Sequence, residues 1–497
     1  MRDALFQVER TQPLTLQAQI RNALISAVSS GQLDSGEPVP STRAMARRIG
    51  VSRNTVVLAY QALVDDGFLL SRERSGFYVN DDMVRDNLSF TTTGNDMQGS
   101  IVDWGARFAI NPGGQDNIQR PITWRNYPYP FIYGQSDPAL FPISEWRECS
   151  RQALGRRWLE DWTSDLYAAD DPMLIQEIRK RILPRRGISA DDEQILITMG
   201  AQNAIYLLAS LLVKPDTRIA FEEPGYPDAR NIFRLKTKSI HPASVDEYGI
   251  KDGPDLNDSD IIFVTPSHQY PTAVTMSPER RKSLLDIASK QDAIIIEDDY
   301  EFETSYVSEP VPALKSQDKD GRVIYIGSLS KSLVPGLRIG FLVAPRKLVE
   351  ELRALRKLML RHPPGNNQRT VAMFLANGHH DMLVHRIHRS YRERWKIMGE
   401  ALNTHLPGWS KMPSFGGSSY WLTGPPELDA NKLAEAALEQ GVVIEPGAVF
   451  YATQPGPTNN FRLGFSQVSA ERIELGIERL AGVIRELLDG SLSGGKK

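Results

Sequence analysis

One lysine stands among residues that could together hold a phosphorylated aldehyde. Lys331 follows two serines, Ser328 and Ser330, and precedes an arginine, Arg338. A lysine amine forms a Schiff base with an aldehyde, while hydroxyl groups and a guanidinium bind phosphate. Asp298 follows an apolar run, so its carboxylate could keep a pyridine nitrogen protonated at the end of a strand. These residue types predict a site for pyridoxal 5'-phosphate.

Two other segments offer partners for the same cofactor. Residues 195–202 have the pattern of a strand, a glycine turn and a helix start, so the backbone N–H groups at Ala201 and Gln202 could bind the phosphate. Junctions of this kind are common, and this one gains meaning only beside the serines and the arginine. Tyr226 lies in a turn rich in proline and glycine. Its ring could stack on the flat cofactor, or simply pack as part of the turn.

Polar residues also follow two of the expected strands, 261–264 and 293–296. Ligands bind at the carboxyl ends of strands in open α/β sheets. Asp298 and Tyr300 follow the second strand, and Tyr300 could form a hydrogen bond to the phenolic oxygen of the cofactor. Asp299 could take the place of Asp298, but the alternation of side chains along a strand sends it to the opposite face.

The elements that must position these residues follow a regular order. From about residue 124 to residue 488, apolar strand-like runs alternate with helical patterns. The expected strands are 195–198, 218–221, 261–264, 293–296, 323–326 and 339–343. This alternation predicts an α/β fold with a mostly parallel sheet and helices on both faces.

The composition changes twice along the chain. Residues 81–123 contain many Asn, Asp, Thr, Gly, Ser and Gln residues and are expected to form a linker. We therefore expect a small domain over residues 1–80, a linker over residues 81–123, and a large domain over residues 124–497.

The N-terminal domain has the element order of a winged helix-turn-helix: helix, short helix, longer helix and hairpin. The longer helix begins with Ser52 as N-cap, followed by Arg53, Asn54 and Thr55. An arginine can bind guanine, an asparagine can bind adenine, and small hydroxyl groups reach phosphate. The start of this helix is therefore expected to contact DNA bases.

Further arginines are expected on the two elements beside this helix. They are Arg43, Arg47 and Arg48 on the preceding helix and Arg72 and Arg74 on the hairpin. Each arginine alone could belong to an ordinary solvated surface. Their occurrence on three adjacent elements favours a DNA-binding surface.

Composition excludes several classes of protein. The chain has 497 residues and a formal net charge of −3, so any basic surface for nucleic acid must be local. Its one cysteine, Cys149, excludes an internal disulfide framework and a cysteine-based zinc site. No apolar run approaches the roughly 20 residues of a membrane-spanning helix, and the N-terminus lacks the pattern of a signal peptide. We expect a soluble cytoplasmic protein.

Four histidines occur close together: His379, His380, His385 and His388. The spacing of the last two could suit a metal ion on one helix face. Because arginines interleave and few carboxylates are near, a cationic helix surface is the favoured interpretation, and we expect no metal site.

The N-terminal motifs resemble a known family. The segments Pro40–Arg43 (PSTR), Gly50–Val56 (GVSRNTV) and Asp66–Phe68 (DGF) look like the winged-helix domain of the GntR regulators. The resemblance covers about residues 14–80. It implies DNA contacts at Arg43, Arg53, Asn54 and Thr55, and at the wing tip around Ser75 and Gly76.

The rest of the chain resembles fold-type I aminotransferases over about residues 124–488. The segments Tyr133–Pro142, Glu297–Tyr300 and Gly327–Lys331 resemble, more narrowly, the MocR/GabR regulators, in which a GntR-type head is fused to an aminotransferase-like module. The resemblance implies that Lys331 forms the internal aldimine, Asp298 pairs with the pyridinium nitrogen, Tyr226 stacks, and Arg462 binds the acidic group of a ligand. It implies phosphate binding by Ser328, Ser330, Arg338, Ala201 and Gln202.

The chain departs from the aminotransferase pattern at one cofactor-contacting position. Aminotransferases usually have Asn-Pro-Thr-Gly where this chain has Tyr270-Pro271-Thr272-Ala273. Either His268 or Gln269 could replace the missing asparagine, and the sequence leaves both open. The sequence of residues 415–419 also differs from that of many relatives. The effector of a relative can therefore not be assigned directly to this chain.

Two functions fit these observations. In the first, a homodimeric regulator binds double-stranded promoter DNA and senses a small effector, whose amino group displaces Lys331 and whose acidic group binds Arg462. Taurine, a γ- or diamino acid or an ectoine-derived compound would suit. In the alternative, the chain is an active aminotransferase with an accessory DNA-binding head. A pure interaction protein with a vestigial site is a weaker third option.

Overall fold

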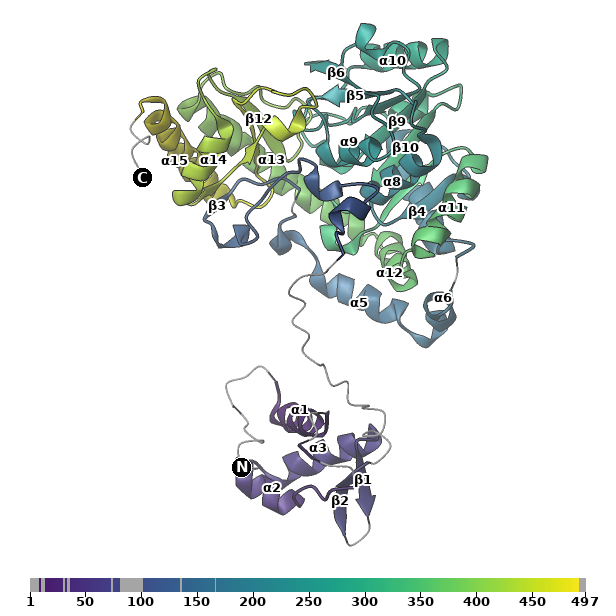
Figure 1. Cartoon of the computed structure of the whole chain (residues 1–497), viewed down its shortest axis with the longest axis vertical. Helices are drawn as coiled ribbons and strands as arrows, with labels where there is room; N and C mark the ends of the chain where they lie inside the picture. Colours follow the sequence, from purple (N-terminus) through teal and green to yellow (C-terminus); the bar gives the residue numbers. More distant parts are fainter. Residues whose placement is uncertain are drawn as a thin grey trace. The chain divides into compact units, whose positions relative to one another are not determined.

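The computed structural model divides the chain into two compact units, Met1–Phe108 and Ala109–Lys497 (Figure 1). It describes residue 9 and residues 14–29, 32–33, 36–72, 75–80, 102–134, 136–165 and 167–490. Within these residues no helix combines the length and the apolar character needed to cross a bilayer.

The first unit is a winged helix-turn-helix. Its elements are α1 (Leu16–Ser29), α2 (Thr42–Ile49), α3 (Arg53–Asp65), β1 (Leu69–Arg72) and β2 (Gly76–Val79). The strands pair antiparallel, with Leu69 opposite Val79. Ile20, Leu24 and Val28 recur every four positions along α1 and are buried in one core with residues of α3 and the hairpin.

Serine side chains cap the N-termini of α2 and α3, and Ser52 is the cap that the sequence predicts for α3. The hydroxyl of Ser41 accepts a hydrogen bond from the Ala44 N–H at 3.2 Å, and that of Ser52 accepts one from the Thr55 N–H at 3.1 Å. Gly50 ends α2 in the left-handed region, at a φ of 68°. Such caps satisfy backbone groups that a helix end leaves without partners.

The second unit contains an eight-stranded sheet within its described residues, with the order β4-β11-β10-β9-β8-β5-β6-β7. The strands are β4 (Ile195–Thr198), β5 (Ile219–Glu223), β6 (Ile240–Asp246), β7 (Gly249–Ile250), β8 (Ile261–Val264), β9 (Ile294–Asp299), β10 (Val323–Ser328) and β11 (Gly340–Val343). Strands β6, β5, β8, β9 and β10 are parallel neighbours, while β11 is antiparallel to β10 and β4. All six predicted strands are present, and the mostly parallel sheet is confirmed.

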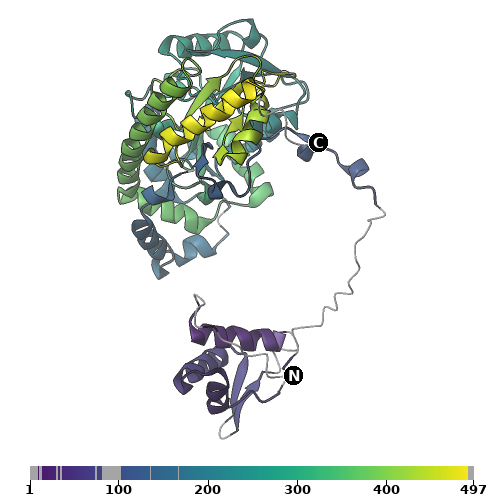
Figure 2. The same cartoon turned by 90° about the vertical axis from the view of Figure 1, so that its left-hand side faces the viewer.

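Helices cover both faces of this sheet, because alternate residues of its strands enter different cores. Ile195 and Ile197 of β4 belong to a core with Phe374, whereas Leu196 packs with Leu207. The helices of the second unit include α5 (Ile143–Ala153), α6 (Leu159–Thr163), α7 (Pro172–Glu177), α8 (Ala201–Leu212), α9 (Pro227–Arg234), α10 (Pro278–Lys290), α11 (Arg346–Leu360) and α12 (Gly365–Ala376). Figure 2 shows the second unit from the side of its C-terminal helix, α15 (Ala470–Leu488), which crosses the front in yellow.

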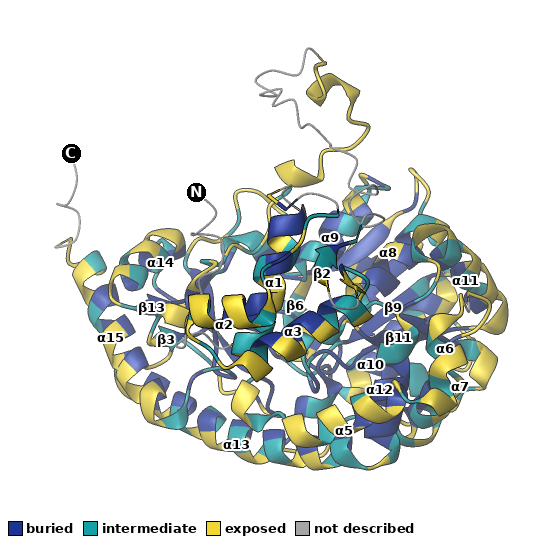
Figure 3. Cartoon of the chain, turned by 90° about the horizontal axis from the view of Figure 1, so that it is seen from below, coloured by how far each residue is buried: buried dark blue, intermediate teal, exposed yellow. Residues whose placement is uncertain are grey.

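A smaller sheet follows in the chain. It has the order β12-β15-β14, formed by β12 (Ser419–Thr423), β15 (Asn460–Gly464) and β14 (Glu445–Pro446). The helices α13 (His379–His405), α14 (Ala430–Glu439) and α15 (Ala470–Leu488) accompany it, and β13 (Val442–Val443) pairs with β3 (Tyr129–Pro130). The long helices α13 and α15 pack together, with a buried and an exposed side each (Figure 3).

Residues 109–123, which the sequence assigns to the linker, make contacts of the large unit. The Gln115 amide donates to the Asn231 carbonyl at 3.1 Å, and Arg120 pairs with Glu445 at 2.6 Å. These long-range contacts could not be recognised from local composition. The contacts of the large unit thus begin before residue 124.

Candidate functional site

A cavity of about 270 Å³ lies at the carboxyl ends of the central parallel strands. All nine residues that the sequence suggested for the cofactor line it: Ala201, Gln202, Tyr226, Asp298, Tyr300, Ser328, Ser330, Lys331 and Arg338. Its other lining residues include Ile118, Arg120, Tyr133, Gly134, Asp228, Tyr270 and Pro335. The structure therefore brings together residues from segments far apart in the chain.

The register of the sheet explains why these side chains meet. Strands β9 and β10 are parallel, with Ile326 opposite Asp298, so the ends of both strands lie at one edge. The next residue, Gly327, has no room for a side chain, because an added Cβ would lie 2.3 Å from the Phe341 ring. Gly134 also has no room for a side chain, since a Cβ there would lie 2.6 Å from the amine of Lys331.

Asp298 and Lys331 form the polar centre of the cavity. Burial, followed by the neighbouring charge of Asp299, raises the pKa of Asp298 to about 8, and its Oδ1 atom has no hydrogen-bond partner. Burial lowers the pKa of Lys331 to about 8, although the Glu301 carboxylate acts in the opposite direction. A buried carboxylate without a partner fits a cationic ring N–H, and an amine that loses its proton readily fits imine chemistry.

A second group of residues forms a cradle suited to a phosphate. Helix α8 begins at Ala201 after Gly200, and no side chain caps its N-terminus. The Arg338 guanidinium lies beside Gly200, 3.1 Å from where a Cβ would stand. The hydroxyl of Ser330 is buried without a partner, next to Ser328. Free N–H groups, hydroxyls and a guanidinium are the donors that bind a phosphate dianion.

Aromatic rings line the rest of the cavity. The Tyr270 ring lies 4.9 Å from that of Tyr226, 5.7 Å from that of Tyr300 and 5.5 Å from that of Tyr133, measured between centroids. The Lys331 amine lies 4.4 Å from the centre of the Tyr133 ring. The rings of Tyr226, Tyr300 and Tyr133 each meet the Tyr270 ring edge to face, so a planar ligand could stack on one ring at a time.

Hydrogen bonds fix several of these side chains in place. Asp228 accepts from the Tyr226 hydroxyl at 3.2 Å and from the Gln202 amide at 3.0 Å. The Tyr300 hydroxyl donates to the His268 carbonyl at 2.7 Å. The side chains around the cavity are therefore held by their neighbours.

Neither His268 nor Gln269 lines the cavity. The Gln269 amide donates to the carbonyls of Pro224 and Tyr270, at 2.8 and 2.7 Å, and its oxygen accepts from Thr272. His268 is buried, with its Nε2 atom 3.2 Å from the Ser305 hydroxyl. Tyr270 itself occupies the position of the missing asparagine and lines the cavity.

Arg462 lies behind the cavity surface rather than in its lining. Its guanidinium pairs with the Glu445 carboxylate at 2.8 Å and donates to the Tyr270 hydroxyl at 2.8 Å. The rings of Tyr133 and Phe450 also lie against it, at 4.2 and 4.9 Å. The arginine expected to bind an acidic group thus already has an acidic partner, which the sequence did not suggest.

Part of α13 fits the cationic helix surface expected from the sequence, since His385 and Arg389 are exposed, but His380 does not belong to it. His380 is fully buried, with its Nε2 atom 3.1 Å from the Ser332 hydroxyl and 2.9 Å from the Glu303 carboxylate. The Nε2 atom of His388 lies beside the Glu303 carbonyl. Among the described residues, no group of three or more His, Cys, Asp or Glu side chains could hold a metal ion.

On the first unit, the polar residues at the start of α3 face solvent. Ser52, Arg53 and Asn54 are exposed and Thr55 is half-buried. Arg43 on α2 is also exposed, and it lines a shallow hollow together with Arg53. In the described part of the chain, the side chains of Arg43, Arg53 and Asn54 form no hydrogen bond or ion pair. They are therefore available to an outside partner.

The wing presents a second polar surface. Ser75 and Gly76 are exposed, and the Ser75 hydroxyl lies 2.6 Å from that of Tyr78. The Arg72 guanidinium covers the Tyr78 ring at 4.3 Å. Arg74, also expected on the wing, lies outside the described residues.

Comparisons with known proteins agree with both units. Residues 16–79 match the family of bacterial regulatory proteins, gntR family, and residues 157–480 match aminotransferase class I and II. The chain is 42% identical over 471 residues to the HTH-type transcriptional regulator TauR of Rhodobacter capsulatus, covering 95% of this chain and 97% of that protein. It is 31% identical over 479 residues to the probable rhizopine catabolism regulatory protein MocR of Rhizobium meliloti, covering 95% and 94%.

Solved structures resemble the large unit. The kynurenine aminotransferase of Pyrococcus horikoshii in complex with PMP has a TM-score of 0.70 and 28% identity, covering 78% of this chain and 100% of that one. The α-aminoadipate aminotransferase LysN of Thermus thermophilus, complexed with N-(5'-phosphopyridoxyl)-L-leucine, has a TM-score of 0.69 and 28% identity, with the same coverage.

Fold and site therefore define a fold-type I aminotransferase-like module joined to a GntR-type winged helix. The chain belongs to the aminotransferase class I and II family and, with its gntR domain, to the MocR-type transcriptional regulators. The family and the solved relatives support pyridoxal 5'-phosphate as the cofactor, and the donors of the cavity fit it.

Proposed function

We propose that this transcriptional regulator senses a small amine through its bound pyridoxal phosphate, the amine displacing Lys331 to form an external aldimine. The observation that carries the proposal is a half-buried lysine, Lys331, that shares one cavity with an unpaired carboxylate, Asp298, in a chain that also has a DNA-binding head. When bound, the cofactor supplies an electrophilic carbon, to which the amine of either Lys331 or an effector can bond.

The residues of the cavity have separate roles in this proposal. Asp298 keeps the ring nitrogen protonated, Tyr226 stacks on the ring, and Tyr300 approaches the phenolic oxygen. The phosphate is bound by Ser328, Ser330, Arg338 and the N–H groups of Ala201 and Gln202. Lys331 returns when the effector leaves, which its lowered pKa favours because the neutral amine is the nucleophile.

The effector carries an acidic group as well as an amine. Arg462, close behind the lining of the cofactor cavity, supplies positive charge for the acidic group, although the charge of Glu445 offsets part of it. Taurine, γ- and diamino acids and ectoine-derived compounds have this combination of groups and form a suitable panel of probes.

The head contacts promoter DNA through the start of α3 and through the wing. Arg53 and Asn54 contact bases, while Arg43, Ser52 and Thr55 bind phosphates and Ser75 and Gly76 lie along the groove. A homodimer would present two heads to two half-sites. Such a regulator acts in the cytoplasm, beside the chromosome.

The alternative of an active aminotransferase with an accessory head is not favoured. The two relatives described above that extend over almost the whole chain are named as regulators, and an enzyme would not need the exposed Arg53 and Asn54. Whether the cofactor cavity also transaminates an amine slowly is tested separately, by analysing the carbonyl products.

Two measurements on the purified full-length protein test the proposal. Absorbance reports whether the protein forms an imine with pyridoxal phosphate, and whether an amine from the panel shifts that absorbance. Binding to its own promoter is compared with binding to a random duplex at ordinary salt. The proposal requires an imine, an amine-dependent shift and a preference for the promoter; loss of any one of them rejects it. Full conversion to pyridoxamine phosphate with release of the matching carbonyl product, an aldehyde from taurine or a keto acid from an α-amino acid, would favour the enzyme.

A further inference from the structure

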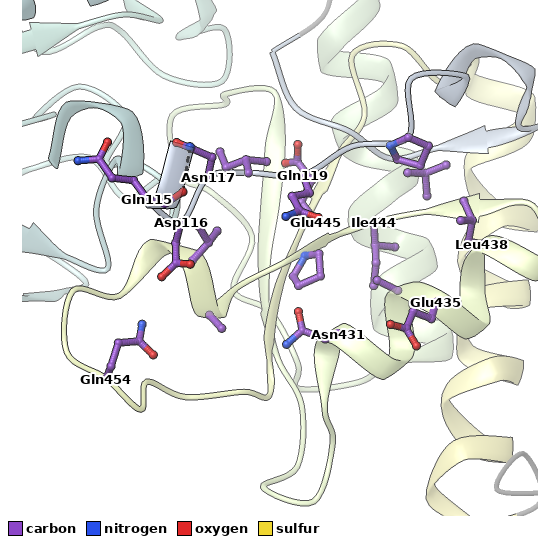
Figure 4. A pocket seen from close by; sticks show the side chains of 18 of the residues that line it. Gln115, Asp116, Asn117, Gln119, Asn431, Glu435, Leu438, Ile444, Glu445 and Gln454 are labelled. Atoms are coloured by element: carbon purple, nitrogen blue, oxygen red, sulfur yellow. Dashed lines mark hydrogen bonds between the residues drawn. The ribbon is translucent and has the colours of Figure 1, made fainter. Parts of the chain in front are cut away.

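The segment 113–121 separates the cofactor cavity from a larger cavity of about 780 Å³. Ile118 and Arg120 line the cofactor cavity, with Lys331. Gln115, Asp116, Asn117 and Gln119 line the larger one, opposite Asn431 and Glu435 of α14 (Figure 4). The segment therefore forms a wall that presents Arg120 to the side where the cofactor binds.

Arg120 is joined to Arg462 through one shared carboxylate. The Glu445 Oε1 atom lies 2.6 Å from Arg120 Nε, and its Oε2 atom lies 2.9 Å from Arg462 Nε. The side chains of Glu445 and Arg462 are 1% exposed, whereas that of Arg120 is 27% exposed. Arg120 is thus the member of the trio that a ligand in the cavity can reach.

The charges of this trio are unbalanced. Two guanidinium groups share one carboxylate, so the trio carries one net positive charge. Burial by itself would raise the pKa of Glu445, but Arg462 and Arg120 outweigh it and hold the pKa below its usual value. Glu445 therefore remains ionised, and one further anionic group would bring the trio to neutrality. A carboxylate or a sulfonate supplies one such charge.

We propose that Arg120 is a specificity-determining residue that binds the acidic group of the effector in competition with Glu445. This inference rests on the proposed function, since it assumes that the effector's amine reaches Lys331. Arg462 is engaged by Glu445 and Tyr270 and does not line the cavity, and Arg338 is assigned to the cofactor phosphate. Arg120 is therefore the guanidinium of the cavity lining that is left for the acidic group.

Binding of the acidic group has a consequence for the wall. The Arg120–Glu445 ion pair holds one end of it, while the other end is held by hydrogen bonds between Asn231 and the carbonyl of Asp116, at 2.8 Å, and the side chain of Asn117, at 3.0 Å. An acidic group that takes Arg120 from Glu445 loosens the first attachment. An amine without an acidic group leaves it intact. The wall begins four residues after Ala109, where the large unit starts.

The test uses the full-length protein loaded with pyridoxal phosphate and three probes: taurine, β-alanine and ethylamine. The affinity of each is measured from the change in cofactor absorbance, and the ratio between the acidic amines and ethylamine is compared among variants. Arg120→Gln should lower this ratio about tenfold or more, because a charge-assisted pair is lost. Arg120→Lys should recover part of it. Glu445→Gln should raise the ratio, because the competitor of the acidic group is removed.

Arg125→Gln is the matched control, since Arg125 is exposed in the same part of the chain and covers the Trp124 ring at 4.3 Å. A merely structural role of Arg120 would change all three affinities together and leave the ratio unchanged, which would overturn the inference alone. If none of the probes shifts the absorbance of the parent protein, the inference and the proposed function both fail. If Arg120→Gln does not fold, the effect of Glu445→Gln on the affinity ratio decides. An increase in the ratio supports the inference, and no increase overturns it.

Discussion

Asp298 and Asp299 are adjacent in β9 and have opposite surroundings. Asp298 lines the cavity with an unpartnered Oδ1 atom, whereas the Oδ2 atom of Asp299 accepts hydrogen bonds from Arg186 at 2.7 Å and from the Tyr325 hydroxyl at 2.8 Å. Both side chains are buried. One carboxylate is therefore free for a ligand, and the other is part of the protein interior.

This difference predicts different effects of the same substitution at the two positions. Asp298→Asn should weaken the binding of pyridoxal phosphate about 10- to 100-fold, the cost of a lost charge-assisted hydrogen bond, with little change in thermal midpoint. Asp299→Asn leaves the buried Arg186 guanidinium without its carboxylate and should lower stability by about 3–5 kcal/mol. Cofactor titration and thermal unfolding separate the two effects, and equal cofactor affinity for Asp298→Asn and the parent would contradict the role given to Asp298.

Lys331→Ala should abolish covalent attachment of the cofactor and leave DNA binding by the head largely intact. Borohydride reduction followed by mass measurement detects the attachment, and promoter binding is measured by fluorescence anisotropy. The exposed Lys347 supplies a control, because Lys347→Ala should retain the reducible adduct. Loss of promoter binding in Lys331→Ala would show that the two units do not function independently.

The lowered pKa of Lys331 predicts a pH dependence of cofactor attachment. Below its pKa of about 8 the amine is protonated and does not attack an aldehyde, so the rate should rise as the pH increases through 8 and then level off. Glu301 favours the protonated amine, so Glu301→Gln should move the midpoint to lower pH. Stopped-flow absorbance after adding the cofactor to the apo protein measures the profile. A rate still rising toward pH 10 would indicate an ordinary lysine.

The buried pair of Arg462 and Glu445 predicts non-additive effects on stability. Arg462→Gln leaves Glu445 with Arg120 alone and should lower stability by about 3–5 kcal/mol, since it breaks a buried ion pair. The double variant with Glu445→Gln should recover part of the loss, because no unpaired charge stays buried. Denaturant unfolding of the single and double variants provides the comparison; additive losses would mean that the two groups do not depend on each other.

At the head, Arg53→Ala should weaken binding to the promoter by about 1–3 kcal/mol if the side chain binds a guanine. If Arg43 binds a phosphate as proposed, Arg43→Ala should weaken binding to any duplex and reduce the slope of the salt dependence by about 1. Arg21 pairs with Asp66 at 3.2 Å, so Arg21→Ala is the control. Unchanged promoter affinity in Arg53→Ala would remove that residue from the interface.

Much of the cofactor cavity could be predicted from the sequence, because its residues lie in short segments with recognisable chemistry. Lys331, its serines and Arg338 are close in the chain, and Asp298 ends an apolar strand. The alternation of side chains along a strand was also enough to separate Asp298 from Asp299, since it is a property of the backbone.

Only the tertiary structure decided which residues surround those segments. Arg120 and Glu445 belong to no local motif, and 325 positions separate them in the chain, so their ion pair depends on the packing of the small sheet against the wall. Likewise, neither His268 nor Gln269 lines the cavity, because long-range hydrogen bonds hold both side chains elsewhere. Residue types and local periodicity thus determined the chemistry and the fold class, whereas contacts between distant segments determined which charges are paired and which remain open to a ligand.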